Sequence, residues 1–311
     1  MSNSDIQDRI QAALRGIEAQ YAEIRIEEAS SSQIRYRGHD LEEISRGSSL
    51  GGCVRVLSGG GWGFVSFNDI EHLDKKDQAA LSHARMVPGE PVKLVETPPV
   101  IDSVPARIGK DPITLSLAEK KSVLDQYVKI LHASPKLQSS TVAYSDGRRK
   151  RFFGNTQGSM LEQDRVDVSV RLSAMARDGS EVQQSGVSLG SLGDFAFVEN
   201  LHADAQDVAD KAVALLRAPE VKGGEYTVIL DPILAGVFVH EAFGHLSEAD
   251  HIYAEPRMQE LMILGKRFGG EHLNIIDGAA VPDLRGSYKY DDEGTQSTRT
   301  DLIREGVLVG R

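Results

Sequence analysis

The segment His240–His245 brings two imidazoles and one carboxylate, that of Glu241, onto a single short stretch of an otherwise apolar region. Desolvating several ionisable groups costs roughly several kcal/mol unless something compensates them, and a metal ion is a common compensator. Imidazole nitrogens and carboxylate oxygens are also the ligands that zinc takes in hydrolases. The segment therefore predicts a metal site with His240 and His245 as ligands.

The spacing of these two histidines is unusual. In the zinc helix His-Glu-x-x-His the ligands are four residues apart and share one face, whereas His240 and His245 are separated by one residue more. At about 100° per residue, five residues rotate the second imidazole by about 140° from the first. A π-type turn, whose period is five, or a break at Gly244 realigns the two rings. We therefore predict a helical irregularity between His240 and His245.

The residues before the histidines indicate how they are positioned. Tyr226–Leu230 is a short apolar run typical of a strand, Asp231 is a good N-cap, and Pro232 occupies the favoured first helical position. The helix that follows is hydrophobic on all sides from Ile233 to Val239, which predicts that it is buried.

The preceding part of the chain alternates between helical and strand periodicity. Residues 21–67 and 138–190 have period-two patterns, the second with a hairpin turn expected at Asp146-Gly147. Prolines, Pro88 among them, indicate an extended connector between about 88 and 112. Amphipathic helices are expected over residues 4–20, 69–86, 116–134 and 200–217.

The fold class expected from these patterns is α+β. Residues 1–222 form an N-terminal domain with an antiparallel sheet and packed helices. Residues 223–311 form a mixed α/β domain that carries the helix with the two histidines, and Gly223-Gly224 marks the boundary.

Composition excludes several classes of function. The formal net charge of the 311 residues is −11, which argues against general binding to nucleic acid or anionic membranes, so the basic run Arg148–Arg151 is interpreted as a solvated strand flank. A single cysteine, Cys53, allows no intramolecular disulfide. The N-terminus lacks a signal-peptide pattern, and no apolar run approaches a membrane span. A cytoplasmic location is expected.

Two motifs make the sequence resemble one family. The run His240–Asp250 is similar to the signature of the TldD/PmbA family of zinc metallopeptidases, on the TldD-like side. Tyr290–Thr295, with Thr298 and Leu302–Gly310, resembles the next block of that family. The resemblance extends over essentially the whole chain and implies that the second domain is a metallopeptidase domain.

The resemblance implies a cytoplasmic, zinc-dependent peptidase for unfolded or small peptides that pairs with a PmbA-like (TldE) subunit as a heterodimer, or with itself. The family is associated with microcin maturation, antitoxin degradation and the label of modulator of DNA gyrase. By position, His240 and His245 would bind Zn2+, and Glu241 would be the general base that deprotonates the metal-bound water.

One departure from the family concerns the third zinc ligand, a cysteine from a C-terminal region that this sequence does not contain. The expectation is a C-terminally truncated sequence whose metallopeptidase domain is incomplete, since two histidines alone hold zinc weakly. Cys53 is a remote substitute, while His251 and His272 are not expected to be ligands.

Several alternatives stay open at this point. Glu248 and Asp250 either orient the ligands or belong to a solvated helix end, and Glu248 could itself bind the metal. Asp291, Asp292 and Glu293 either line the cleft or form an exposed acidic turn. The protein is expected to be a zinc metallopeptidase; the alternatives are a non-catalytic regulatory or interaction subunit with a vestigial metal site, and a zinc hydrolase acting on a non-peptide amide.

Overall fold

The computed structural model describes residues 3–87, 89–95 and 97–311, so Met1, Ser2 and the connector residue Pro88 lie outside the described residues. The chain forms two compact units. Unit 1 comprises Met1–Pro219 and Asp292–Gly294, and unit 2 comprises Glu220–Asp291 and Thr295–Arg311. The mixed α+β class expected from the sequence is confirmed.

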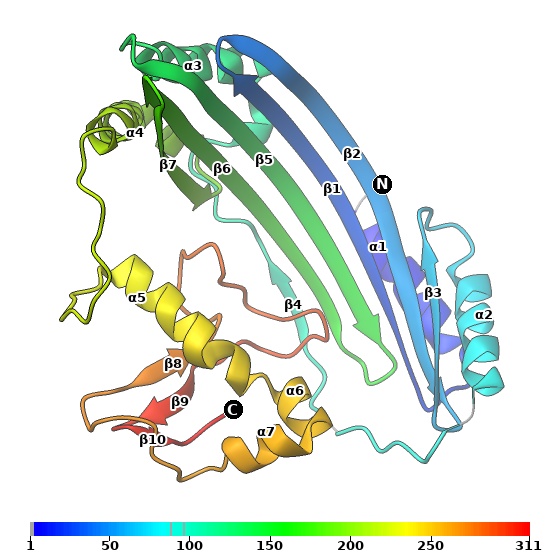
Figure 1. Cartoon of the computed structure of the whole chain (residues 1–311). Helices are drawn as coiled ribbons and strands as arrows, with labels where there is room; N and C mark the ends of the chain where they lie inside the picture. Colours follow the sequence, from blue (N-terminus) through cyan, green and yellow to red (C-terminus); the bar gives the residue numbers. More distant parts are fainter. Residues whose placement is uncertain (1–2, 88, 96) are drawn as a thin grey trace. The chain divides into compact units, whose positions relative to one another are not determined.

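Unit 1 is built on one large sheet of long strands (Figure 1). Its order is β3-β2-β1-β5-β6-β4, with β7 also pairing β6, and every pairing is antiparallel except that of β4 with β6. The strands are β1 (Tyr21–Arg37), β2 (Asp40–Ser58), β3 (Gly61–Phe67), β4 (Ile101–Val104), β5 (Leu137–Asn155), β6 (Met160–Asp178) and β7 (Glu181–Leu192). The proline-rich connector therefore contributes a short edge strand, β4.

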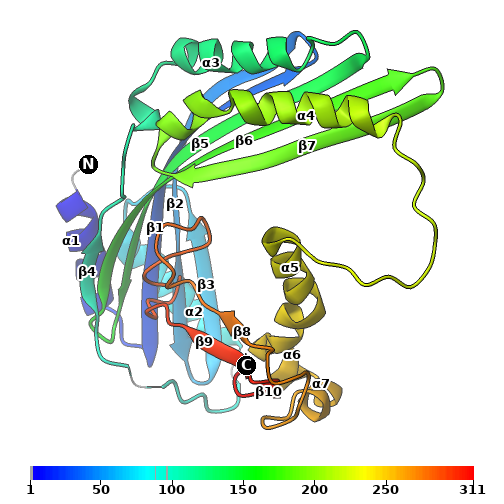
Figure 2. The same cartoon turned by 90° about the vertical axis from the view of Figure 1, so that its left-hand side faces the viewer.

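Four helices pack on one face of this sheet, as Figures 1 and 2 show. They are α1 (Asn3–Arg15), α2 (Leu73–Met86), α3 (Leu117–Ile130) and α4 (His202–Leu215). The first two cover one end of the strands around Ile24 and Phe152, and the other two cover the opposite end around Ile34 and Val170. The expected capping box at the start of α3, between Ser116 and Glu119, is present.

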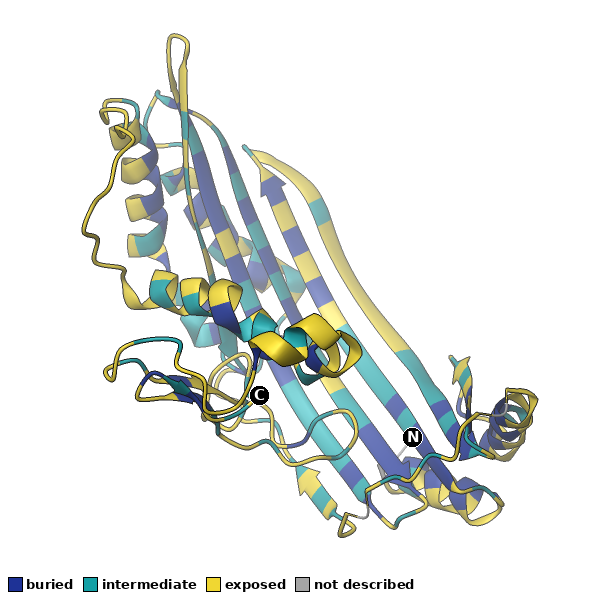
Figure 3. Ribbon diagram, turned by 60° about the horizontal axis from the view of Figure 1, so that its bottom comes forward, coloured by how far each residue is buried: buried dark blue, intermediate teal, exposed yellow. Residues whose placement is uncertain are grey.

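Burial alternates along the strands, as Figure 3 shows. On β1 the even-numbered residues, such as Ile24 and Ile34, enter the helix-covered core, whereas Arg25 and Arg35 point to the other side. In the pairing register the odd-numbered residues of β1 lie opposite odd-numbered residues of β5, and these lie opposite odd-numbered residues of β6, so all of them face away from the helices. The second face of the sheet is called the open face below.

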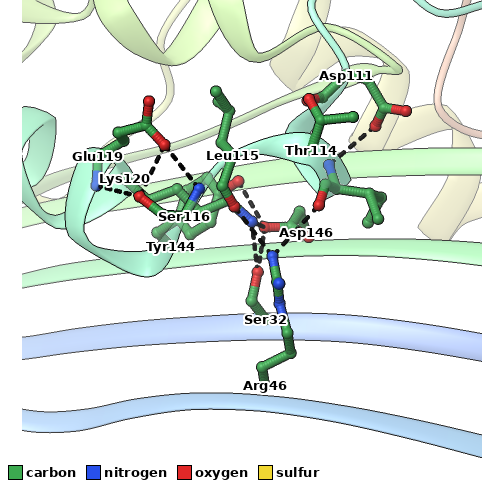
Figure 4. A network of polar contacts seen from close by, with 11 residues as sticks. Ser32, Arg46, Asp111, Thr114, Leu115, Ser116, Glu119, Lys120, Tyr144 and Asp146 are labelled. Atoms are coloured by element: carbon green, nitrogen blue, oxygen red, sulfur yellow. Dashed lines mark hydrogen bonds and ion pairs between the residues drawn. The ribbon is translucent and has the colours of Figure 1, made fainter.

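The hairpin expected at Asp146-Gly147 is wrong: β5 runs without interruption through both residues. Asp146 lies in the core, where its Oδ2 is 2.5 Å from Lys120 Nζ of α3 and accepts hydrogen bonds from the hydroxyls of Ser32 and Tyr144 (Figure 4). Lys120 itself is 0% exposed. This ion pair and the two neighbouring strands keep the Asp-Gly pair extended, although locally it favours a turn.

A second buried carboxyl is that of Asp77 in α2. Its side chain is 1% exposed and neither oxygen makes a hydrogen bond to any described residue. Burial, with a smaller contribution from Asp74, raises the pKa of Asp77 to about 7. The carboxyl is therefore in its neutral form in the folded protein below that pH.

Replacing Asp77 with Asn should stabilise the protein at pH 8 by about 1–3 kcal/mol and change little at pH 4. The unfolded carboxyl loses its proton near pH 4 while the folded one keeps it up to about pH 7, so the wild-type free energy of unfolding falls between these values. Denaturant melts of both proteins at pH 4, 6 and 8 measure this, with exposed Glu71→Gln as the control, because Glu71 does not contribute to the pKa of Asp77. A stability gain that is the same at all three pH values would contradict it.

The described residues of unit 2 contain three α-helices and a three-stranded antiparallel sheet in the order β10-β9-β8. The helices are α5 (Pro232–Val239), α6 (Ala249–Ala254) and α7 (Pro256–Leu261); the strands are β8 (Ile275–Asp277), β9 (Thr300–Arg304) and β10 (Val307–Leu308). A small core that includes Phe243, Ile252, Met262 and Ile303 joins these elements.

Two expectations about the start of this unit are wrong. Tyr226–Leu230 is not a strand, because no described segment pairs with it, and Ile229 is 98% exposed. Helix α5 begins at Pro232 with Asp231 as its N-cap, as expected, but none of its residues is buried and Ile233 is 82% exposed. An apolar helix is buried only if other residues cover it, and in α5 only Ala235 and Val239 are half-buried, the latter against the core of unit 2.

Candidate metal centre

The first histidine directly follows α5, and the helix changes period at that point. Residues His240–Gly244 form a π-helical turn in which the backbone N–H of His245 donates to the carbonyl of His240, five residues earlier. A short 3-10 turn, His245–Ser247, follows. The irregularity predicted from the five-residue spacing is confirmed.

The π turn places the two imidazoles together. Their ring centroids are 4.4 Å apart, at an angle of 65°. A β-carbon at Gly244 would lie 3.4 Å from His240 Nδ1, which is an ordinary contact, so the approach of the rings comes from the π turn and does not require glycine. Phe243 fixes the turn to the core of unit 2: it is buried and packs edge-on against Phe268, with ring centroids 5.4 Å apart.

Glu241 completes a cluster with the two histidines. One ligand atom from each of His240, Glu241 and His245 lies within 4.8 Å of the others, and all three side chains are exposed. Zinc with ligand bonds of about 2 Å holds its ligand atoms roughly 3–4 Å apart, which small side-chain rotations would reach here. The two imidazole nitrogens fit zinc, and the Glu241 carboxylate lies beside them.

Glu248 orients the second histidine. Its Oε1 lies 2.7 Å from His245 Nδ1, and its other oxygen lies 3.3 Å from His251 Nδ1. The hydrogen bond to Glu248 raises the pKa of His245, and the same bond lowers the pKa of Glu248. Because Nδ1 is engaged, His245 presents Nε2 toward Glu241, whose Oε2 is 3.8 Å away. A carboxylate behind an imidazole in this way is the usual support for a metal-ligating histidine.

The other residues named from the sequence are placed differently. Asp250 in α6 makes no hydrogen bond or ion pair with either imidazole among the described residues, and His251 contacts the cluster only through Glu248. Cys53 lies in β2 of unit 1, where burial raises the pKa of its thiol. The Phe243–Phe268 contact could not be predicted from sequence patterns, because the two rings belong to residues 25 positions apart in the chain.

These features define a class: a mixed α+β protein whose second unit carries a histidine–glutamate cluster suited to a metal. Sequence models of one family match the chain in three parts, namely PmbA/TldA metallopeptidase domain 1 over residues 22–84, the central domain over 110–218 and the C-terminal domain over 223–311. The chain belongs to the PmbA/TldD family.

Relatives with curated names agree with this. The chain is 43% identical over 296 residues to a metalloprotease of Synechocystis sp., covering 94% of this chain and 64% of the relative. It is 28% identical over 297 residues to a zinc metalloprotease TldD homolog of Saccharolobus solfataricus, covering 93% and 64%. The chain thus spans about 64% of the length of these relatives.

Solved structures share the fold at low sequence identity. A candidate modulator of a DNA gyrase from Thermotoga maritima superposes with a TM-score of 0.76 at 20% identity, covering 99% of this chain and 70% of the other. TldE from Thermococcus kodakarensis superposes with a TM-score of 0.71 at 16% identity, covering 98% and 69%. No helix among the described residues is both long and apolar enough to cross a membrane.

Proposed function

We propose that the protein is the TldD-like subunit of a zinc-dependent peptidase that acts on unfolded or small peptides in the cytoplasm. The observation that carries the proposal is the π turn, which brings His240, Glu241 and His245 within 4.8 Å of one another despite a spacing that a regular helix would misalign. Support comes from the metalloprotease names of its relatives.

In this proposal each residue has a separate task. His240 and His245 hold the zinc, and Glu248 fixes the ring of His245 through Nδ1. Bound zinc would lower the pKa of a coordinated water and polarise the scissile carbonyl. Glu241, on the same turn, takes the proton released as the peptide bond is attacked and returns it to the leaving amine.

The decisive experiment measures zinc and cleavage in the same samples. We expect the purified chain to bind zinc, and chelation to remove both the metal and any hydrolysis of a quenched fluorescent peptide. A side-by-side assay with small non-peptide amides separates a peptidase from a hydrolase of another kind. A chain that binds no zinc, and whose interactions are unchanged by His240→Ala, would instead be a non-catalytic subunit.

A homologous subunit is part of the proposal. The support is the fold shared with TldE and the exposed apolar surface of α5, including Ile233 and Phe238. Exposed apolar surface of this kind is typical of an interface. We propose assembly with a TldE-like partner or a second copy, which co-purification and mass measurement would detect.

Replacing Glu248 with Gln should weaken zinc binding about 10- to 100-fold, because an amide orients the His245 ring less firmly and makes its Nε2 less basic. Competition with a chromophoric chelator at pH 7.5 measures the affinity. Glu260→Gln, which removes an exposed carboxylate from α7, is the matched control. Equal zinc affinities in the two variants would exclude an orienting role for Glu248.

A further inference from the structure

The open face of the unit 1 sheet is rich in arginine. Register and burial place there the side chains of Arg25, Arg35, Arg37, Arg55, Arg149, Arg151, Arg165 and Arg171. The carboxylates on the same face are Glu23, Glu27, Asp40, Glu43 and Asp167 on the strands, with Asp292 and Glu293 added by unit 1. The charges of the face nearly balance, so its capacity to bind an anion depends on the arginines that make no ion pair within it.

Some of these arginines are neutralised within the sheet. Arg25 and Arg55 share the buried Glu23, at 2.5 and 3.1 Å. Arg151 pairs with Glu27 at 2.9 Å, and Arg165 with Asp167 at 2.7 Å.

Arg35, Arg149 and Arg171 are exposed and make no ion pair with any described residue. Arg149 also lies directly opposite Arg165 in the β5–β6 ladder. Like charges in directly opposed positions destabilise a sheet. Asp167, which pairs with Arg165 at 2.7 Å, offsets part of this repulsion, and an anion bound to Arg149 would offset more of it.

Unit 1 already holds two carboxylates on this face. Its segment Asp292–Gly294 pairs Asp292 with Arg151 at 3.2 Å and Glu293 with Arg55 at 2.7 Å. Gly294 follows so close to the sheet that a β-carbon there would lie 2.9 Å from the ring of Phe153. An acidic stretch of polypeptide is thus accommodated on the open face.

We propose that the open face binds an acidic polypeptide segment, whose carboxylates pair with Arg149, Arg171 and Arg35. Arginine matches carboxylate in a bidentate manner, which favours such a partner over a diffuse anion. Alternate side chains of an extended peptide are about 7 Å apart, the spacing of Arg149 and Arg151 along β5.

The distance from Arg149 to Arg171 and Arg35 defines the length of the acidic segment that could contact all three. Arg171 and Arg35 both pair with Ala143, which lies six residues from Arg149 on β5, or about 20 Å along the strand. Between them the open-face residues of β5 are Ser145 and Gly147, whose small side chains leave room for a peptide backbone. An acidic stretch of about eight residues spans this distance. This binding does not depend on the proposed peptidase activity.

Fluorescence anisotropy with a labelled octapeptide of alternating Glu and Ser tests the proposal. The full chain carries Glu241→Gln and a chelator is present, so the labelled peptide is not hydrolysed during the measurement. The result is therefore independent of whether the chain is a peptidase. We expect saturable binding that weakens as salt rises, and no binding of the Lys/Ser counterpart. Arg149→Glu with Arg171→Glu should weaken binding about 100-fold, at about tenfold for each lost pair.

The matched control is Arg85→Glu with Arg257→Glu, which changes the net charge equally at exposed sites on α2 and α7. Thermal melts confirm folding, and Arg149→Gln with Arg171→Gln replaces the double variant if that variant is unfolded. Equal weakening in the control, wild-type binding in the double variant, or tighter binding of a single-stranded oligonucleotide would each overturn the proposal.

Discussion

Replacing Glu241 with Gln is expected to lower the rate of peptide hydrolysis about 10²- to 10⁴-fold without releasing zinc. Gln fills nearly the same space and keeps an oxygen near His245 Nε2, but it cannot accept a proton at neutral pH. The imidazoles are held by the π turn and by Glu248, neither of which involves the Glu241 side chain. Initial rates at saturating zinc, with bound metal quantified in the same samples, give the result.

Glu248→Gln is the control for this experiment, since it removes a second carboxylate of the same cluster. It should recover near wild-type rates once zinc saturates the site, because its role is to orient His245. Undiminished hydrolysis by Glu241→Gln would remove the proposed base. A loss of zinc in Glu241→Gln would instead make Glu241 a ligand, which its place in the cluster also allows.

The local geometry of this site could be predicted because one structural requirement dominates it. Two imidazoles five residues apart can bind one metal ion only if the helix is irregular between them, through a π turn or a break, and His240–Gly244 is a π turn. The N-cap at Asp231 and the start of α5 at Pro232 were also predictable, because both depend only on residues within the first helical turn.

Features that depend on distant residues could not be predicted. Asp146-Gly147 favours a turn locally, yet it is extended because Lys120, in another element, pairs with the carboxylate. The apolar character of α5 indicates burial, but whether the helix is covered depends on residues other than its own.

The basic run Arg148–Arg151 shows the same limit. Its interpretation as a solvated flank treats the four side chains alike, whereas in β5 they alternate between faces. Arg148 pairs with Asp164 on the helix-covered side, while Arg149 and Arg151 lie on the open face. Only the strand register, set by β1 and β6, divides the run into these two groups.

Lys120→Met should destabilise unit 1 by about 3–5 kcal/mol, the cost of leaving a buried charge without its partner. Asp146 would keep the hydroxyls of Ser32 and Tyr144 on Oδ2, but its other oxygen already lacks a hydrogen bond. The helix α3 would lose the ion pair that fixes it to β5. Denaturant melts at pH 7 measure the free energy of unfolding.

The neighbouring Lys121→Met is the control, because Lys121 pairs with Asp125 one turn along the same helix and both side chains are about one-third exposed. It should cost no more than about 1 kcal/mol. Lys120→Met combined with Asp146→Leu should recover much of the loss, since an apolar pair leaves no charge unpaired. If the double variant were no more stable than Lys120→Met alone, the loss would come from packing around the lysine rather than from the unpaired carboxylate.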